Sequence, residues 1–218
     1  MVNIKAVIFD LDNTLVDRKK AFHHYCLSFI DDHFSNQDLP DTKDNMIQYM
    51  TLLDNDGLCN RHDVFGLIIN KWDIKGYDAQ QLCDNFNDTF YKFTTPDVDM
   101  HMILNYLIPK YKLGIITNGS SKSQNGKIDH IGIREMFDSV IVSDDVGVHK
   151  PDERIFNISC SALGIKHDQA VYVGDNHEKD IVGAKNAGLY AIWYTDDSSE
   201  LYSYDCKIKR LSEIMSIL

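Results

Sequence analysis

The chain has 218 residues, 44% of them hydrophobic and 25% charged, which is the composition of a globular protein with a sizeable core. Its formal net charge of −11 argues against a general affinity for nucleic acid or for an anionic membrane surface. The five cysteines are scattered, which argues against a disulfide framework or a structural zinc site and fits a reducing cytoplasm. No apolar run reaches membrane-spanning length, and no signal peptide is expected.

Residues 6–15 (AVIFDLDNTL) begin as a short apolar run, which predicts a buried strand, and continue into Asp10 and Asp12. Residues two apart in an extended chain point the same way, so both carboxylates can face one cleft while Leu11 packs on the other side. Two like charges held that close repel each other unless a cation or a proton lies between them. The stretch is therefore a candidate site for a hard metal ion, with an ordinary polar turn as the alternative. Asn13 suits left-handed backbone at the turn, and the Thr14 hydroxyl is expected to tie it.

Residues 16–91 show helical spacing and predict an inserted all-helical segment. Apolar residues recur at three- and four-residue steps, as in Phe22, Tyr25, Cys26, Phe29 and Ile30. These positions are interpreted as the core of a helix bundle. Asp41, Asp63 and Asp78 are expected to cap the starts of helices, where a carboxylate accepts hydrogen bonds from unpaired amides.

From residue 94 onward, expected strands and helices alternate. Strands are expected at 112–117, 139–142, 170–173 and 190–194, with a weak one near 207–208. A loop is expected at 144–151, and helices at 100–108, 152–163, 179–187 and from Leu211. This alternation predicts an α/β fold with a parallel sheet covered on both faces, in which ligands bind beyond the carboxyl ends of the strands. We expect residues 1–15 and 92–218 to form this core, and residues 16–91 to form a second domain.

Three further polar clusters follow the expected strands. Thr117, Asn118 and Gly119 offer a hydroxyl and backbone amides that can hold phosphate oxygens. Lys150, just before a proline and a helix, can add a positive charge to the same phosphate. In the third cluster, Gly174 to Asp180, two carboxylates five residues apart can complete a magnesium site.

Taken in order, these clusters resemble the four motifs of the haloacid dehalogenase-like superfamily of phosphohydrolases. Residues 10–14 (DLDNT) match the first motif, 116–119 (ITNG) the second, Lys150-Pro151 the third and 174–180 (GDNHEKD) the fourth. The resemblance implies a Rossmann-like core with an α-helical cap at residues 16–91, similar to the caps of phosphoglycolate phosphatases and pyrimidine 5′-nucleotidases. Val98-Asp99 is a departure, because relatives often have a glycine at this helix entry.

The resemblance also implies a chemistry, which is magnesium-dependent hydrolysis of a small phosphomonoester through an aspartyl-phosphate. Asp10 would be the nucleophile, and Asp12 would protonate the leaving oxygen and then activate water. The metal would be held by Asp10, Asp175 and the backbone carbonyl of Asp12. A nucleoside monophosphate or a sugar- or glycolate-type phosphate is the expected substrate.

Phosphate oxygens would be bound by Thr117, Asn118, Gly119 and Lys150. Thr14 and Asp180 would support the site without touching the metal, Asp180 by orienting Lys150 or a metal-bound water.

Three alternatives stay open on the sequence. A phosphoglucomutase would share all four motifs and differ mainly in its cap. A dehalogenase needs no acid for a halide leaving group, so Asp12 argues against it. A non-catalytic binding module is the third alternative.

Overall fold

The computed structural model describes residues 3–35, 39–198 and 203–218, and these residues divide into two compact units. The first unit comprises residues up to Asp17 together with Pro96–Leu218, and the second comprises Arg18–Thr95. The division at 15/16 and 91/92 expected from sequence, and the role of the second unit as a cap, stay predictions.

The first unit is built on a six-stranded parallel sheet with the strand order β3-β2-β1-β4-β5-β6. Its strands are β1 (Ala6–Phe9), β2 (Lys112–Thr117), β3 (Ser139–Val142), β4 (Ala170–Gly174), β5 (Tyr190–Tyr194) and β6 (Cys206–Ile208). The four inner strands, β2, β1, β4 and β5, are short apolar runs, as strands buried on both faces require, whereas the edge strands β3 and β6 are partly exposed. The strand order is that of a Rossmann-like fold, which confirms the expected fold class.

The strand order reverses next to β1, because β2 pairs with one side of β1 and β4 with the other. Ligands in such sheets bind beyond the carboxyl ends of the strands at this reversal. The ends of β1, β2 and β4 are therefore the place where this sheet presents a site.

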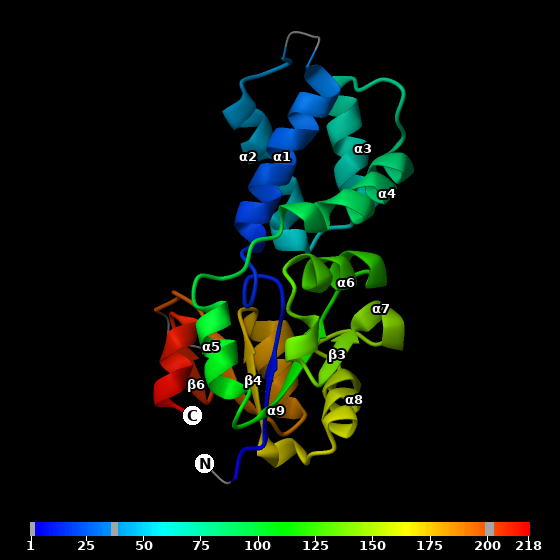
Figure 1. The fold of residues 1–218 in the computed structure, drawn as a ribbon. Coiled ribbons are helices and arrows are strands. Elements are labelled where there is room, and N and C mark those ends of the chain that lie inside the picture. The colour runs from blue at the N-terminus through cyan, green and yellow to red at the C-terminus, as the bar shows by residue number, and fades with distance from the viewer. Residues whose placement is uncertain (1–2, 36–38, 199–202) are drawn as a thin grey trace. The chain divides into compact units, whose positions relative to one another are not determined.

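Helices cover both faces of the sheet (Figure 1). On one face, α5 (Met100–Leu107), α6 (Ser121–His130) and η6 (Leu211–Ser216) pack against side chains such as Val7 and Phe9. On the other, α8 (Glu153–Leu163) and α9 (Gly183–Asn186) pack against Ala6 and Ile8. The alternation of side chains along β1 thus supplies the core on both sides. The remaining short helices are η3 (Arg134–Met136), α7 (Ser143–Val146), η4 (His167–Gln169) and η5 (His177–Val182).

Three local predictions in this unit need correction. The expected loop at 144–151 begins with the short helix α7. The expected helix at 179–187 starts earlier, as the π-helical turn η5, and continues as α9. The helix expected from Leu211 is the 3-10 helix η6.

The second unit is all-helical, as predicted. Its elements are α1 (Arg18–Phe34), α2 (Lys43–Asp54), η1 (Asn55–Gly57), α3 (Arg61–Trp72), α4 (Ala79–Thr89) and η2 (Phe90–Phe93). The predicted apolar stripe of α1 lies in one hydrophobic cluster with residues of α2, α3 and α4. None of the described helices in either unit is long and apolar enough to cross a membrane.

One of the three expected caps is correct. Asp78 caps α4, and Gln81 completes a reciprocal capping box. The cap of α2 is Thr42 rather than Asp41, and that of α3 is Asn60 rather than Asp63. In both cases a second good capping residue lies within three positions, and the backbone of that residue has the extended conformation that a cap needs.

Candidate active site

Asp10 follows the last residue of β1 and is held there by its own backbone, since its amide donates to the carbonyl of Val173 on β4. Its carboxylate is buried, and Oδ1 accepts a hydrogen bond of 2.6 Å from Nζ of Lys150. Lys150 is buried as well, so this is an ion pair shielded from water. In that setting the attraction is strong and the partners are hard to separate.

Lys150 is fixed at both its backbone and its ammonium group. Asn118, directly after β2, accepts from the Lys150 amide at 2.9 Å and donates to the Lys150 carbonyl at 3.0 Å. The ammonium group also donates to Oδ1 of Asp180 at 2.7 Å and to the hydroxyl of Tyr172 at 2.9 Å. The second, third and fourth sequence clusters therefore meet at Lys150.

Asp180 is buried and fully engaged by protein groups. Besides Lys150, its Oδ1 accepts from the Tyr172 hydroxyl at 3.1 Å, and its Oδ2 accepts from the Asn176 amide at 2.9 Å. Gly174 makes this possible, because a Cβ at that position would lie 2.5 Å from Cγ of Asp180. The glycine of the fourth motif thus leaves space for the aspartate six residues later.

Asp175, directly after β4, brings a third carboxylate to the site. One oxygen each from Asp10, Asp175 and Asp180 lie within 4.8 Å of one another. Among the described residues, no group donates to the Asp175 carboxylate or to Oδ2 of Asp10, whereas both oxygens of Asp180 are occupied. Carboxylate oxygens are the ligands that Mg²⁺ prefers, so the residues present fit a magnesium ion held by Asp10 and Asp175.

The electrostatics of the site favour a bound cation. Burial raises the pKa of Asp10 to about 7, with Lys150 opposing this shift and Asp180 adding to it. Burial also raises the pKa of Asp175 to about 8, helped by the charges of Asp10 and Asp180. Burial lowers the pKa of Lys150, but Asp10 and Asp180 outweigh it and raise that pKa above its ordinary value. One ammonium group thus does not offset three carboxylates, which leaves a place for a divalent ion.

Asp12 lies apart from these three carboxylates. Its side chain is bound by α6, where Lys127 Nζ lies 2.8 and 2.7 Å from its two oxygens and Gln124 Nε2 lies 3.0 Å from Oδ2. The Asp12 carboxylate is therefore outside the candidate metal cluster, which agrees with a ligand role through its backbone carbonyl only.

The turn after Asp12 differs in one respect from its prediction. Asn13 has φ of 57°, the left-handed geometry expected. The hydroxyl of Thr14, however, is buried without a hydrogen-bond partner in the described chain. The turn is held instead by the carbonyl of Leu11, which accepts from the amides of Thr14, Leu15 and Val16.

The remaining expected phosphate ligands follow β2. Thr117 is its last residue, and no described residue bonds its hydroxyl, which suits a phosphate ligand. The Gly119 amide donates to the hydroxyl of Ser143 at 3.0 Å, so it would have to leave this partner to bind phosphate. The roles of all nine residues stay predictions.

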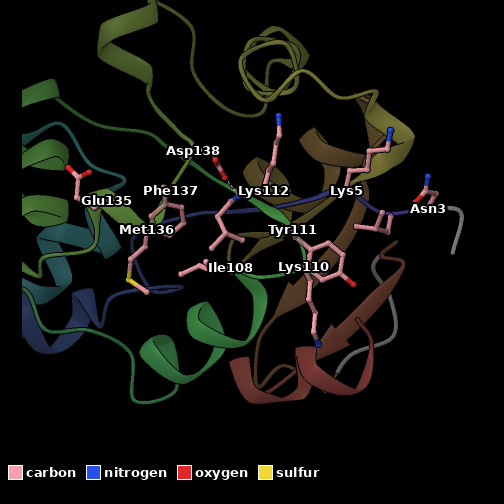
Figure 2. A pocket seen from close by; sticks show the side chains of 12 residues that line it. Asn3, Lys5, Ile108, Lys110, Tyr111, Lys112, Glu135, Met136, Phe137 and Asp138 are labelled. Atoms are coloured by element: carbon pink, nitrogen blue, oxygen red, sulfur yellow. Dashed lines mark hydrogen bonds between the residues drawn. The ribbon is translucent and has the colours of Figure 1, made fainter.

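A hollow of about 610 Å³ lies on the other side of the sheet from the site, at the amino ends of β1, β2 and β3 (Figure 2). Three of its lining residues are lysines, but their ammonium groups point in different directions. That of Lys112 is bound to the carbonyl of Leu163, and that of Lys110 lies over the ring of Tyr106. This hollow therefore offers no converging set of cations.

Comparison with known proteins agrees with this geometry. The profile of the haloacid dehalogenase-like hydrolase family matches residues 7–194. The chain belongs to this family. The matched range includes all four motif clusters, and the match confirms the resemblance seen in the sequence.

Named members of the haloacid dehalogenase-like family are similar over different lengths. A glyceraldehyde 3-phosphate phosphatase of Pyrococcus abyssi is 30% identical over 88% of this chain and 81% of its own. A pyrimidine 5′-nucleotidase of Escherichia coli is 35% identical over 52% of this chain, and the chain spans about half the length of that relative (51%). The crystal structure of a phosphatase of this family from Thermococcus onnurineus is 28% identical, with a TM-score of 0.70 over 98% of this chain and 97% of its own.

Three residues at this family site were not predicted from sequence. Tyr172 belongs to an apolar strand, so its sequence position indicates a core residue. Gln124 and Lys127 belong to α6, whose sequence matches none of the four motifs. The one available signal was the spacing of Gln124 and Lys127, which places both on the same side of a helix.

Proposed function

We propose that this protein is a magnesium-dependent phosphatase that hydrolyses small phosphomonoesters through an aspartyl-phosphate on Asp10. The observation that carries the proposal is the surroundings of Asp10. One oxygen is held by Lys150, the other has no donor among the described residues, and Asp175 lies beside it. A carboxylate fixed by one oxygen presents the second in a defined direction, as a nucleophile requires.

In the first step a carboxylate oxygen of Asp10 attacks phosphorus, and the bond between phosphorus and the leaving oxygen breaks. Asp12 gives its proton to that oxygen, so the alcohol leaves neutral. Thr117 ends β2, Asn118 follows it, and Lys150 contacts Asp10 from the segment after α7. These three residues would bind the oxygens of the phosphoryl group being transferred. Their charge and hydrogen bonds stabilise the negative charge on those oxygens, which is the main source of catalysis in phosphoryl transfer.

In the second step a water molecule attacks the phosphorus of the aspartyl-phosphate, and Asp12 takes up its proton. Inorganic phosphate leaves and the Asp10 carboxylate is restored. Magnesium bound to Asp10 and Asp175 would supply positive charge that offsets the repulsion between the carboxylate and the phosphate. Asp180 keeps Lys150 in place through both steps.

The substrate class follows from the family. Its members here carry names for acting on glyceraldehyde 3-phosphate and pyrimidine nucleotides, both small phosphomonoesters. Among the described residues of the helical unit no motif selects between such substrates, so we propose the class and not one compound.

Phosphate release by the purified chain tests the proposal. The substrates are p-nitrophenyl phosphate, glyceraldehyde 3-phosphate, phosphoglycolate and pyrimidine nucleoside monophosphates, each with magnesium and with excess chelator. We expect release that depends on magnesium. Release of halide from 2-haloacids with no phosphate from any ester would instead identify a dehalogenase. Interconversion of sugar phosphates without net phosphate release would identify a mutase. No turnover of any of these substrates would identify a binding module.

A further inference from the structure

Asp12 and Asp10 are anchored to different parts of the core unit. Asp10 is paired with Lys150, whereas the Asp12 carboxylate is held by Lys127 and Gln124 of α6. Both α6 residues are buried, and the Asp12 side chain keeps 20% of its surface exposed. The anchoring groups therefore lie inside the protein, and the carboxylate lies at the boundary with solvent.

Gln124 also connects Asp12 to the loop that follows β2. Its Nε2 donates both to Asp12 and to the carbonyl of Asn118, the latter at 2.7 Å. Gly119 packs against it so closely that a Cβ would lie 2.5 Å from Nε2. Asn118 in turn holds the backbone of Lys150. Gln124 thus links the proposed acid to the residues proposed to bind phosphate.

A buried ion pair between Lys127 and Asp12 contributes little net stability as a connection between α6 and the turn after β1. Burying an ammonium group is costly unless it is paired, and apolar residues of similar size often serve such a connection equally well. The adjacent carboxylates of Asp10, Asp175 and Asp180 also repel Asp12, so its position needs an opposing attraction. Lys127, which contacts both oxygens, and Gln124, which contacts one, supply that attraction and fix the rotation of the carboxylate.

We propose that Lys127 and Gln124 are positioning residues that hold the Asp12 carboxylate where it exchanges a proton with the leaving oxygen and then with water. This inference rests on the proposed phosphatase function. A displacement of about 1 Å at a catalytic group can cost roughly a hundredfold in rate. Loss of Lys127 should therefore act on the chemical step that needs the proton.

The test compares the parent with Lys127→Met, Asp12→Asn and the double variant, using an alkyl phosphate and p-nitrophenyl phosphate. Lys5→Met is the matched control, because Lys5 is an exposed lysine at the opposite edge of the sheet (Figure 2). For Lys127→Met we expect kcat/KM to fall by roughly 10- to 100-fold with the alkyl ester and less with the aryl ester, whose leaving group needs no proton. In the Asp12→Asn background the same substitution should change kcat/KM less than about twofold, because residues that act through one group are not additive. Lys5→Met should leave both substrates unchanged.

A purely structural role predicts a different pattern. Equal losses with alkyl and aryl esters, or a full additional loss in the Asp12→Asn background, would overturn the inference while leaving the phosphatase proposal intact. A parent that releases phosphate from neither ester would overturn the phosphatase proposal itself. If Lys127→Met does not fold, Lys127→Gln, whose shorter side chain is uncharged, carries the same comparison, with an expected alkyl-selective loss of roughly 3- to 10-fold.

Discussion

The ammonium group of Lys150 lies 2.6 Å from Oδ1 of Asp10, although 140 positions separate the two residues in the sequence. The contact exists because β2 is the neighbour of β1 in the sheet, and Asn118, directly after β2, holds the backbone of Lys150 beside Asp10. It leaves Oδ2 of Asp10 as the oxygen with no protein donor among the described residues. This asymmetry is what the nucleophile assignment depends on.

Asp10→Asn should abolish turnover while the fold is kept. An amide has nearly the shape of a carboxylate, and its oxygen can still accept from Lys150, but it does not attack phosphorus. We expect phosphate release to fall by about a thousandfold or more, with an unchanged circular dichroism spectrum. Turnover close to the parent's in a folded, purified variant would remove Asp10 as the nucleophile.

Asp175→Asn should separate metal binding from folding. Asp175 is a half-buried carboxylate that no cationic group bonds among the described residues, and desolvation with two neighbouring carboxylates raises its pKa to about 8. Neutralising it should therefore raise the melting temperature in chelator, because an uncompensated buried charge is removed. In the parent, magnesium should raise the melting temperature by binding the folded state, and this rise should be absent in the variant. Melting curves of the parent and of Asp175→Asn, each with magnesium and with chelator, measure both effects. A full magnesium-dependent rise in Asp175→Asn would contradict the assignment of this ligand.

Gly174→Ala should impair both stability and activity. The added Cβ would lie 2.5 Å from Cγ of Asp180, so the aspartate must shift, and with it the anchor of Lys150. We expect a loss of about 1–3 kcal/mol in unfolding free energy, as for other over-packed cores, together with at least a tenfold lower kcat.

Gly66→Ala is the control for this substitution. Gly66 lies within α3, where a Cβ would meet nothing within 4 Å, so alanine should stabilise the helix by roughly 0.5–1 kcal/mol. Urea unfolding measures both variants. Equal stability changes of the same sign would contradict the steric account of Gly174.

Asp99 should contribute stability that disappears in acid. Its carboxylate accepts from Arg210 and Ser212, which ties the start of α5 to η6 and lowers its pKa to about 2. A carboxyl with a lowered pKa in the folded state stabilises the fold above its ordinary pKa of about 4, and this contribution is lost as pH falls from about 4 to about 2. Asp99→Asn should therefore lower the free energy of unfolding by about 1–2 kcal/mol at pH 7, a modest loss because Arg210 is exposed and solvent screens the pair. Near pH 3 the loss should be clearly smaller. A cost for Asp99→Asn that is the same at both pH values would exclude the linkage.

The sheet and the motif positions could be predicted because both depend on short-range patterns. Buried parallel strands are continuous apolar runs, and the strands at Lys112–Thr117, Ser139–Val142 and Tyr190–Tyr194 begin and end where the sequence indicated. The polar residues after β1, β2 and β4 converge because these strands are neighbours and their carboxyl ends lie on the same side of the parallel sheet. Helix caps were harder, since Asp41 and Thr42 are adjacent candidates and only the backbone conformation decides between them.

The partners of the motif residues could not be predicted in the same way. Lys127 lies on a helix with a polar sequence, where a lysine ordinarily faces solvent, and only the three-dimensional position of α6 places it on Asp12. Tyr172 sits in a strand whose other residues are apolar, so the role of its hydroxyl at Lys150 has no local signature. Thr14 shows the converse, because a hydroxyl that suited a turn in sequence has no bond in the described chain.

Asp12→Asn should distinguish a phosphatase from a dehalogenase. An alkyl phosphate leaves as an alkoxide, which is a poor leaving group without a proton, and a positioned acid contributes about a hundredfold or more in rate. Asn cannot give up that proton, although its side-chain oxygen can still accept from Lys127 and Gln124, so the local structure should be kept. Alkyl phosphates should therefore be hydrolysed at least about a hundredfold more slowly.

Aryl phosphates give the more specific part of this prediction. A phenolate leaves readily without a proton, so Asp10 should still be phosphorylated by p-nitrophenyl phosphate in Asp12→Asn. The second step should nevertheless be slow, because the attacking water has lost its base. Rapid-quench sampling should then show a burst of p-nitrophenol and an acid-stable phosphoenzyme that is absent from the Asp10→Asn, Asp12→Asn double variant. Parent-like hydrolysis of alkyl phosphates by Asp12→Asn would remove the acid–base role. A slow variant without the burst would place the function of Asp12 in the first step alone.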